Sequence, residues 1–391
     1  MRILHSAQTI SPFGDAVGNL PFLDLSFDHF RQREVSRVRA NSALFTFAPW
    51  AFASAPILEA FRRVAKPGTP ARLALPATHV SRIYQPLSSI DIQDGKLLFD
   101  IFLNAAPEAP LDDLRKSCEP VTIELESKTA FRQLPRIGQG PHQFEYPVDG
   151  CFAAHFEHWV HLLWAIPNLV PNLLGDSRNR VGRNVTIHPT AYLENSIIGD
   201  NSNIGAGCFI SNSYIGPNSQ LFDFTKVRNS VLGDNTHTLA DASFSHVVSF
   251  GGATLSNLLL RDVILGRNCF VTTGVIFQDQ SIGDPVTVLK DGKEVSTQRM
   301  ALGGCAGHGC VLGARAIIAP GRALPNRTTI VMRREEGVHK ISAHSKDTPM
   351  CWNNGTLTPA VEMLMQGDVD EFEDDRRHYP PLLGLGMSND G

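Results

Sequence analysis

Aliphatic residues recur between residues 181 and 244 at steps of six, six and five positions, and these three steps together make one repeat of seventeen positions. This pattern predicts short flat strands, each turning one aliphatic side chain into a shared core. Three strands per repeat describe a triangular parallel β-helix, whose coils stabilise one another only by stacking. The predicted inward positions are Val181, Ile187, Leu193, Ile198, Ile204, Ile210, Ile215, Leu221, Val227, Leu232, Thr238 and Phe244.

The polar positions of the repeat are equally regular. The motif Asn-Ser-apolar-apolar-Gly occurs three times and ends at Gly199, Gly216 and Gly233, so that each copy begins one full repeat after the last. Glycine suits a corner where φ is positive or where a Cβ has no room, and the sequence leaves both readings open. Asparagine tolerates left-handed backbone geometry. We therefore interpret the motif as one corner of the column.

A second pattern interrupts the repeat at about 284–299. Two alternating runs flank Asp291-Gly292, which predicts a β-hairpin inserted as an arm that projects from the column. The period of the repeat resumes beyond it and stops near residue 335. We expect a β-helix at 181–335 and a C-terminal tail at 336–391.

The segment before the repeats mixes helical and strand patterns, so residues 1–150 are expected to form an α/β domain. Helical spacing predicts helices within 19–35 and 53–68, and apolar runs predict strands at 42–52, 96–103 and 120–127.

A further helix, predicted at 151–170, would bridge the two domains through a linker that ends at residue 180. His155, His158 and His161 lie in it at every third position, spread over about 120° of the helix surface. We interpret these histidines as packing residues at the interdomain seam and expect no metal site.

Composition narrows the class of partner. Thirty-five basic and thirty-nine acidic residues give a net charge of −4, which argues against a nucleic-acid backbone or an anionic membrane as partner and favours small molecules. The chain has seven cysteines, an odd number that argues against a disulfide framework and for the cytoplasm. Cys305 and Cys310 are interpreted as small packed thiols. No apolar run is long enough to predict a membrane span or a signal peptide.

The hexads with their Asn-Ser corners, and the order of α/β domain, bridging helix, interrupted β-helix and tail, resemble the sugar-1-phosphate nucleotidylyltransferases fused to hexapeptide-repeat acyltransferase domains. The nearest likeness is to the bifunctional N-acetylglucosamine-1-phosphate uridylyltransferase and glucosamine-1-phosphate acetyltransferase family. This resemblance implies a left-handed β-helix and a homotrimer. It also implies transfer of an acyl group from acetyl-CoA or another acyl-CoA to an amino sugar or sugar phosphate.

The same resemblance implies that residues 1–150 are a shortened nucleotidylyltransferase-like domain. The Gly-rich phosphate-binding loop of the family would fall at 11–23, which holds Gly14 and Gly18 but no basic residue. A triphosphate needs a cation there, so we interpret the domain as vestigial. Mg²⁺ would be a cofactor only if this domain were active. Asp24 and Asp28 are then possible ligands, although their spacing also fits surface acids.

Acyl transfer requires a base for the attacking amine and donors for the thioester oxygen. The family places a histidine after an Asn-Ser corner, where His237 and His246 are the candidates, although direct alignment puts Ala240 at that position. His308 is a third candidate, because the glycines on both sides of it would admit a ligand close to the backbone. Arg299, Arg315 and Arg322 are candidates to bind phosphates of the sugar or of coenzyme A, or else are solvated surface arginines. A non-catalytic binding or regulatory subunit, or a sugar-1-phosphate nucleotidylyltransferase, is the alternative function.

Overall fold

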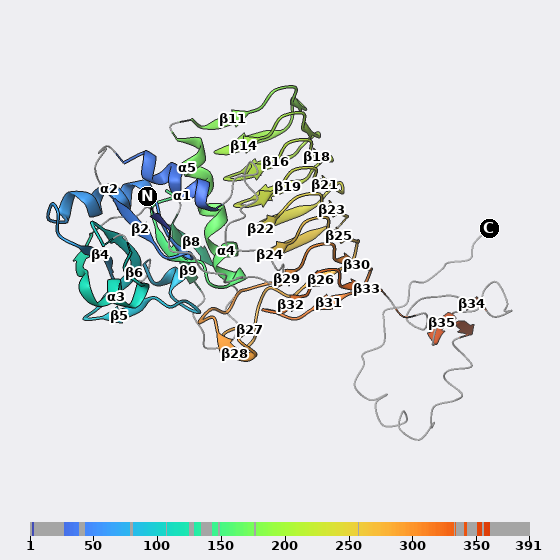
Figure 1. Cartoon of the computed structure of the whole chain (residues 1–391). Coiled ribbons are helices and arrows are strands. Elements are labelled where there is room, and N and C mark those ends of the chain that lie inside the picture. Colours follow the sequence, from blue (N-terminus) through green and yellow to red (C-terminus); the bar gives the residue numbers. More distant parts are fainter. Residues whose placement is uncertain are drawn as a thin grey trace, which may run out of the picture. The chain divides into compact units, whose positions relative to one another are not determined.

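The chain has two compact units, Met1–Val331 and Met332–Gly391. In the second unit, a small sheet has the strand order β34-β36-β35, from Lys340–Ile341, Thr356–Pro359 and Met350–Asn353. The computed structural model (Figure 1) describes residues 2–3, 27–38, 44–78, 81–106, 108–124, 129–133, 143–147, 149–175, 177–256, 258–331, 333, 340–341, 350–353 and 356–359.

The first unit begins with the expected α/β region. Its six-stranded sheet has the order β1-β2-β6-β4-β7, with β5 paired to β6. Aromatic and aliphatic side chains of β2, β6 and α2 fill the core, among them Phe47, Phe61 and Phe99. The strands are β1 Arg2–Ile3, β2 Phe45–Phe47, β3 Ala51–Ala53, β4 Ala71–Pro76, β5 Asp91–Gln93, β6 Lys96–Leu103, β7 Glu119–Thr122, β8 Thr129–Gln133, β9 Gln143–Pro147 and β10 Ala153–His155.

The helices of this region include the two that the sequence predicts. Helix α2 ends before Pro67-Gly68, as proline and glycine require. Arg31 of α1 is buried and donates from Nη1 to the carbonyl of Ala48 at 2.9 Å, which ties α1 to the turn between β2 and β3. The helices are α1 Phe27–Ser36, α2 Ala55–Val64, η1 Ser81–Tyr84, α3 Leu111–Ser117, α4 Trp159–Ala165, η2 Ile166–Leu169 and α5 Val170–Leu174.

The bridging segment differs from the helix predicted at 151–170. Its first part is β10, which pairs antiparallel with β3, and the helix begins only at Trp159. The prediction of helix before Trp159 was wrong because pairing with β3 outweighs the local helical pattern. His158 caps the helix through Nδ1, which accepts from the backbone N–H of Val160 at 3.3 Å. Among the described residues, no helix is long and apolar enough to cross a membrane.

The repeats form the predicted left-handed parallel β-helix, in which each strand stacks in register on the strand one repeat later, as Tyr214 does on Val231 (Figure 1). The first face of the column lies against α4, η2 and α5, and its outward side chains share one apolar cluster with them. This face contains β11 Asn179–Val181, β14 Ser196–Ile198, β17 Tyr214–Ile215, β20 Val231–Leu232, the second halves of β22 Ser243–Ser249 and β24 Leu259–Leu265, β29 Cys305–Ala306 and β32 Ala323–Leu324.

The other two faces are not covered by these helices. The second face is an eight-stranded sheet of β12 Thr186–Ile187, β15 Asn203–Ile204, β18 Gln220–Leu221, β21 His237–Thr238, β23 Thr254–Leu255, β25 Phe270–Val271, β30 Val311–Leu312 and β33 Thr329–Ile330. The third face contains β13 Tyr192–Glu194, β16 Phe209–Ser211, β19 Lys226–Arg228, the first halves of β22 and β24, β26 Ile276–Phe277 and β31 Ile317–Ile318.

The predicted inward residues form the core of the column. All of them from Ile198 to Phe244 are buried. Val181, in the first coil, is 47% exposed because the coil that would cover it is missing at the end of the stack. Cys208, Cys269 and Cys310 lie in the same core, and Cys305 is also buried, so the reading of Cys305 and Cys310 as packed thiols is confirmed.

Three residues of the Asn-Ser-apolar-apolar-Gly motif have distinct roles. Asn212 turns the corner with φ 46°. Ser213 is buried, and its hydroxyl accepts the backbone N–H of Ser230 in the next coil at 3.2 Å. Gly216 does not have a positive φ, but a Cβ there would lie 2.5 Å from the carbonyl carbon of Gly233. Of the two readings of the glycine, lack of space is therefore the correct one.

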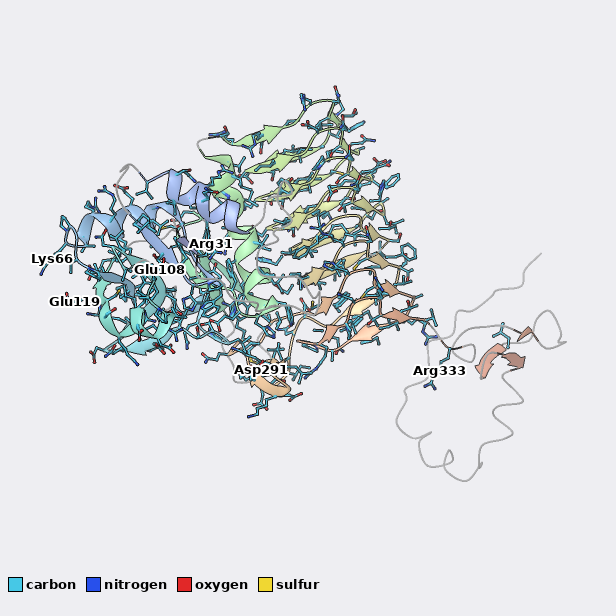
Figure 2. The ribbon with its side chains drawn as sticks, viewed as in Figure 1. Arg31, Lys66, Glu108, Glu119, Asp291 and Arg333 are labelled. Atoms are coloured by element: carbon cyan, nitrogen blue, oxygen red, sulfur yellow. The ribbon has the colours of Figure 1, made fainter. Side chains whose placement is uncertain are left out.

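The predicted hairpin is also confirmed, but its free projection is not. β27 Thr287–Lys290 and β28 Lys293–Ser296 form an antiparallel hairpin whose turn residues Asp291 and Gly292 both have positive φ; Asp291 is labelled at its tip in Figure 2. The Nζ of Lys290 donates to the carbonyl of Leu87 at 2.6 Å. The arm therefore contacts the α/β region and does not project freely.

Candidate functional site

One corner of the column carries a row of residues in the left-handed conformation. Asn195, Asn212, Asn229, His246 and Asp262 have φ between 46° and 54°. They follow one another at the spacing of the repeat, except that Asp262 comes one position early. The first three are the motif asparagines. His246 and Asp262 occupy the same corner of the next two coils, so stacking alone brings a histidine and a carboxylate into neighbouring positions.

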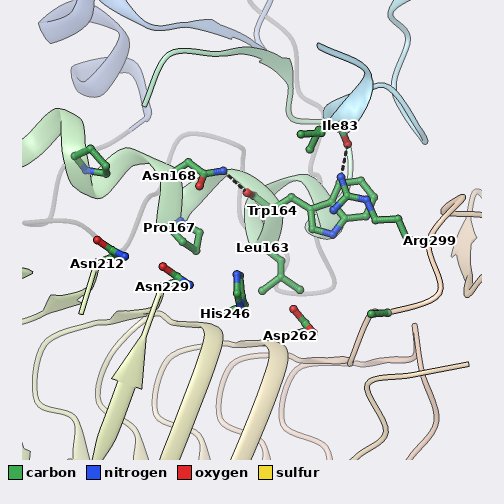
Figure 3. Close-up of a pocket in the computed structure, with 12 residues that line it drawn as sticks. Ile83, Leu163, Trp164, Pro167, Asn168, Asn212, Asn229, His246, Asp262 and Arg299 are labelled. Atoms are coloured by element: carbon green, nitrogen blue, oxygen red, sulfur yellow. Dashed lines mark hydrogen bonds between the residues drawn. The ribbon is translucent and has the colours of Figure 1, made fainter. Parts of the chain in front are cut away.

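Four residues of this corner row, Asn212, Asn229, His246 and Asp262, border a cavity beneath the bridging helices (Figure 3). The cavity has a volume of about 50 Å³. Its walls combine the polar corner row with apolar side chains of α4 and η2. The lining residues are Ile83, Leu163, Trp164, Pro167, Asn168, Pro171, Asn212, Asn229, His246, Asp262, Arg299 and Ala301.

Arg299 enters this cavity from the end of the arm. Its Nη2 donates to the carbonyl of Ile83 at 2.8 Å, and its guanidinium carbon lies 3.6 Å from the ring centre of Trp164. Burial lowers the pKa of Arg299 to about 10, while Tyr84 and Asp262 act in the opposite direction. The side chain therefore stays a cation at neutral pH and is held in a fixed position.

His246 is partly buried, and its Nδ1 lies 3.2 Å from the Oγ of Ser245. Asp262 is 8% exposed, and its carbonyl accepts the backbone N–H of Gly303 at 3.0 Å. Two of the six predicted site residues, His246 and Arg299, thus line one cavity. Asp262 was not among the sequence candidates, because the spacing shortens by one position before it and seventeen residues after His246 comes Val263.

His308 has a structural role that its glycine-rich surroundings did not indicate. Its Nδ1 accepts the backbone N–H of Arg267 at 2.7 Å, and its own N–H donates to Oδ1 of Asn326 at 2.9 Å. Asp200 makes the equivalent bond to the N–H of Arg183, at 2.8 Å. His308 therefore replaces a corner carboxylate that links adjacent coils.

The remaining candidates lie apart from the cavity. His237 is exposed on β21 of the second face. Arg315 is exposed at a corner with φ 67°. Arg322 pairs through Nη1 with Oε1 of Glu294 at 3.2 Å and donates from Nη2 to Oγ1 of Thr287 at 3.3 Å. Arg322 thus fastens the arm to the column.

The candidate nucleotide and magnesium residues cannot be placed. The stretch 11–23 and Asp24 lie outside the described residues, and so does the side chain of Asp28. Within the described part of the chain, no group of three or more His, Cys, Asp or Glu side chains is arranged to hold a metal ion.

The three histidines of the bridging segment are buried and make different contacts. Nε2 of His158 lies 3.1 Å from the carbonyl of Leu289, and Nε2 of His161 lies 2.7 Å from the carbonyl of Pro86. Burial lowers the pKa of His158 to about 4 and that of His161 to about 3. Both rings are therefore neutral at pH 7 and donate from Nε2. His155 is buried beside Glu157, with 3.3 Å between Nδ1 and Oε1.

Comparison with known proteins gives one family match, which lies at the start of the column. Residues 180–212 match the family model described as bacterial transferase hexapeptide (six repeats). One similar solved structure is described as UDP-N-acetylglucosamine acyltransferase from Campylobacter jejuni. It shares 16% identity, the match covers 38% of this chain and 68% of that one, and the TM-score is 0.16. No curated protein matches the chain. The matched stretch is thus similar to the hexapeptide repeats of bacterial transferases.

Proposed function

We propose that this protein is an acyltransferase that moves an acyl group from acyl-CoA to an amino group of a sugar or sugar phosphate. The observation that carries the proposal is the cavity at the corner row, which His246, Asp262 and Arg299 line together. The hexapeptide match over 180–212 supports the transferase class.

In the proposed step, the amine nitrogen attacks the thioester carbonyl carbon. The C–N bond forms, the C–S bond breaks, and the proton lost by the amine passes through a ring nitrogen of His246 to the departing thiolate. Arg299 supplies positive charge for the carbonyl oxygen or for a sugar phosphate. The carboxylate of Asp262 favours the histidine cation that forms transiently.

The cavity volume of about 50 Å³ has room for only a few water molecules. The sugar and the body of the acyl donor would therefore lie outside the cavity, with only the reacting atoms reaching the corner row.

The test uses the full chain with acetyl-CoA or octanoyl-CoA and glucosamine 1-phosphate, measuring release of free coenzyme A. Loss of a general base lowers rates by about 10²–10⁴, so we expect His246→Ala to slow the reaction at least about 100-fold. His237→Ala is the matched control, because His237 is exposed on another face, and should retain the full rate. Equal rates in both variants would remove His246 from the proposed step.

A non-catalytic binding subunit is the second candidate. It is favoured by the use of His308, Arg299 and Arg322 in intramolecular contacts. This function predicts that coenzyme A or a sugar phosphate binds in calorimetric titration while no thiol is released with any donor.

We also propose a homotrimer, which would cover apolar side chains such as Phe270 (41% exposed) and Val311 (36% exposed) on the second face. Sedimentation equilibrium should give the mass of three chains. The mass of a single chain would contradict this.

A further inference from the structure

A groove of about 760 Å³ lies on the third face of the column, where the arm leaves it. Its volume is in the usual range for small-molecule sites, about 300–1,000 Å³. Four of its aliphatic side chains are half exposed or more: Leu258, Leu259 and Ile276 at 50% and Ile282 at 78%. Single exposed aliphatic residues are ordinary, but four around one concave surface indicate a binding site.

The groove and the cavity lie on opposite sides of one corner. Arg261 lines the groove and the next residue, Asp262, lines the cavity, because the chain turns at Asp262 from the third face to the first. The two segments at the base of the arm also separate the groove from the cavity. Asp279 lines the groove and Ala301 lines the cavity. The two segments are joined where the N–H of Leu302 donates to the carbonyl of Asp279 at 3.0 Å.

The charges of the groove favour a neutral occupant. Its two charged side chains are Arg261 and Asp279, with 3.7 Å between Nε and Oδ2, so they offset each other. On β24, Arg261 is next to the corner and Leu259 is farther from it. Along β24 the groove therefore runs from a charged side chain near the cavity to aliphatic side chains farther from it.

We propose that this groove binds the aliphatic chain of the acyl donor, with the thioester at the corner beside Asp262. The inference rests on the proposed function and deepens it, because it names an acyl group of several carbons, and not acetyl, as the group transferred. An acyl chain matches the pattern of the groove, with its polar thioester near the cavity and its neutral chain over Leu259 and Ile276.

The experiment is calorimetric titration of the full chain with acetyl-, butyryl- and octanoyl-CoA. Burial of each CH₂ is expected to raise affinity about fourfold, until the groove is filled. Ile276→Ser should weaken octanoyl-CoA binding about tenfold and leave acetyl-CoA binding unchanged. Ile317→Ser is the matched control: it pairs with Ile276 on the neighbouring coil and is 64% exposed, but it does not line the groove.

Equal affinities for the three donors, or equal effects of the two serine variants, would overturn the assignment. A change in sedimentation mass of Ile276→Ser without a change in octanoyl-CoA binding would instead identify the groove as a contact between copies of the chain, and would also overturn it. The proposed function fails separately: chain-length-dependent binding without coenzyme A release contradicts catalysis, while equally fast transfer of acetyl and octanoyl groups contradicts only the groove assignment.

Discussion

Replacement of Gly216 by alanine tests why the repeat contains glycine. The new Cβ would lie 2.5 Å from the carbonyl carbon of Gly233 and 2.7 Å from the Cα of Asp234. Normal contacts lie at about 3.5 Å, so the two coils would have to separate locally by about 1 Å. Backbone hydrogen bonds hold the coils together and oppose this separation. The N–H of Gly216 donates to the carbonyl of Leu232 at 2.8 Å, and the N–H of Gly233 donates to the carbonyl of Ser249 at 2.9 Å.

The expected cost combines overpacking, about 1–3 kcal/mol, with one weakened ladder bond, about 1 kcal/mol. We therefore expect Gly216→Ala to lower the free energy of unfolding by about 2–4 kcal/mol, measured as a shift of the urea midpoint followed by circular dichroism. Gly274→Ala is the control within the same column: its φ is +83°, and the nearest atom to a Cβ is 3.8 Å away. It should cost only backbone strain, about 1–2 kcal/mol. A midpoint for Gly216→Ala equal to or above that of Gly274→Ala would refute the steric explanation.

Two further changes test the bridging segment and the corner row. Because the folded pKa values of His158 and His161, about 4 and about 3, lie below the unfolded value near 6.5, their contribution to stability is complete above pH 6.5 and is lost as the pH falls toward 4. Each histidine can contribute on the order of 3 kcal/mol to the free energy of unfolding. The urea midpoint of the unchanged protein should therefore fall between pH 6.5 and pH 4.5, and that of His161→Gln should fall less. Parallel pH profiles for the unchanged protein and His161→Gln would contradict this. At the corner, Asn229 has φ 46°, so Asn229→Ala should lower the urea midpoint by the equivalent of about 1 kcal/mol and Asn229→Gly by less; the opposite order would show that the backbone conformation is not the reason for asparagine.

The sequence does not predict which candidate residues line the cavity together. His246 and Arg299 were identified as separate candidates, but their meeting depends on two long-range events: the stacking of coils and the docking of the arm against Trp164 and Ile83. His308 shows the reverse case, since a histidine between glycines gave no sign that its Nδ1 would accept a backbone bond from Arg267, 41 residues earlier. Such contacts depend on which coils are adjacent in the stack, and the local amino-acid composition does not indicate this.

The sequence by itself determined the β-helix, its corners and the arm. These features follow from a short period and from local backbone preferences, which the same repeat expresses again in each coil. Only the tertiary structure decided that β10 pairs with β3 in place of a longer helix, that the corner glycines exclude a Cβ, and that His246, Asp262 and Arg299 share one cavity. The physical reason is that the period of the repeat determines which residues stack above and below each position in the column. The contacts that the column, the bridging helices and the arm make with one another depend instead on packing across the whole unit.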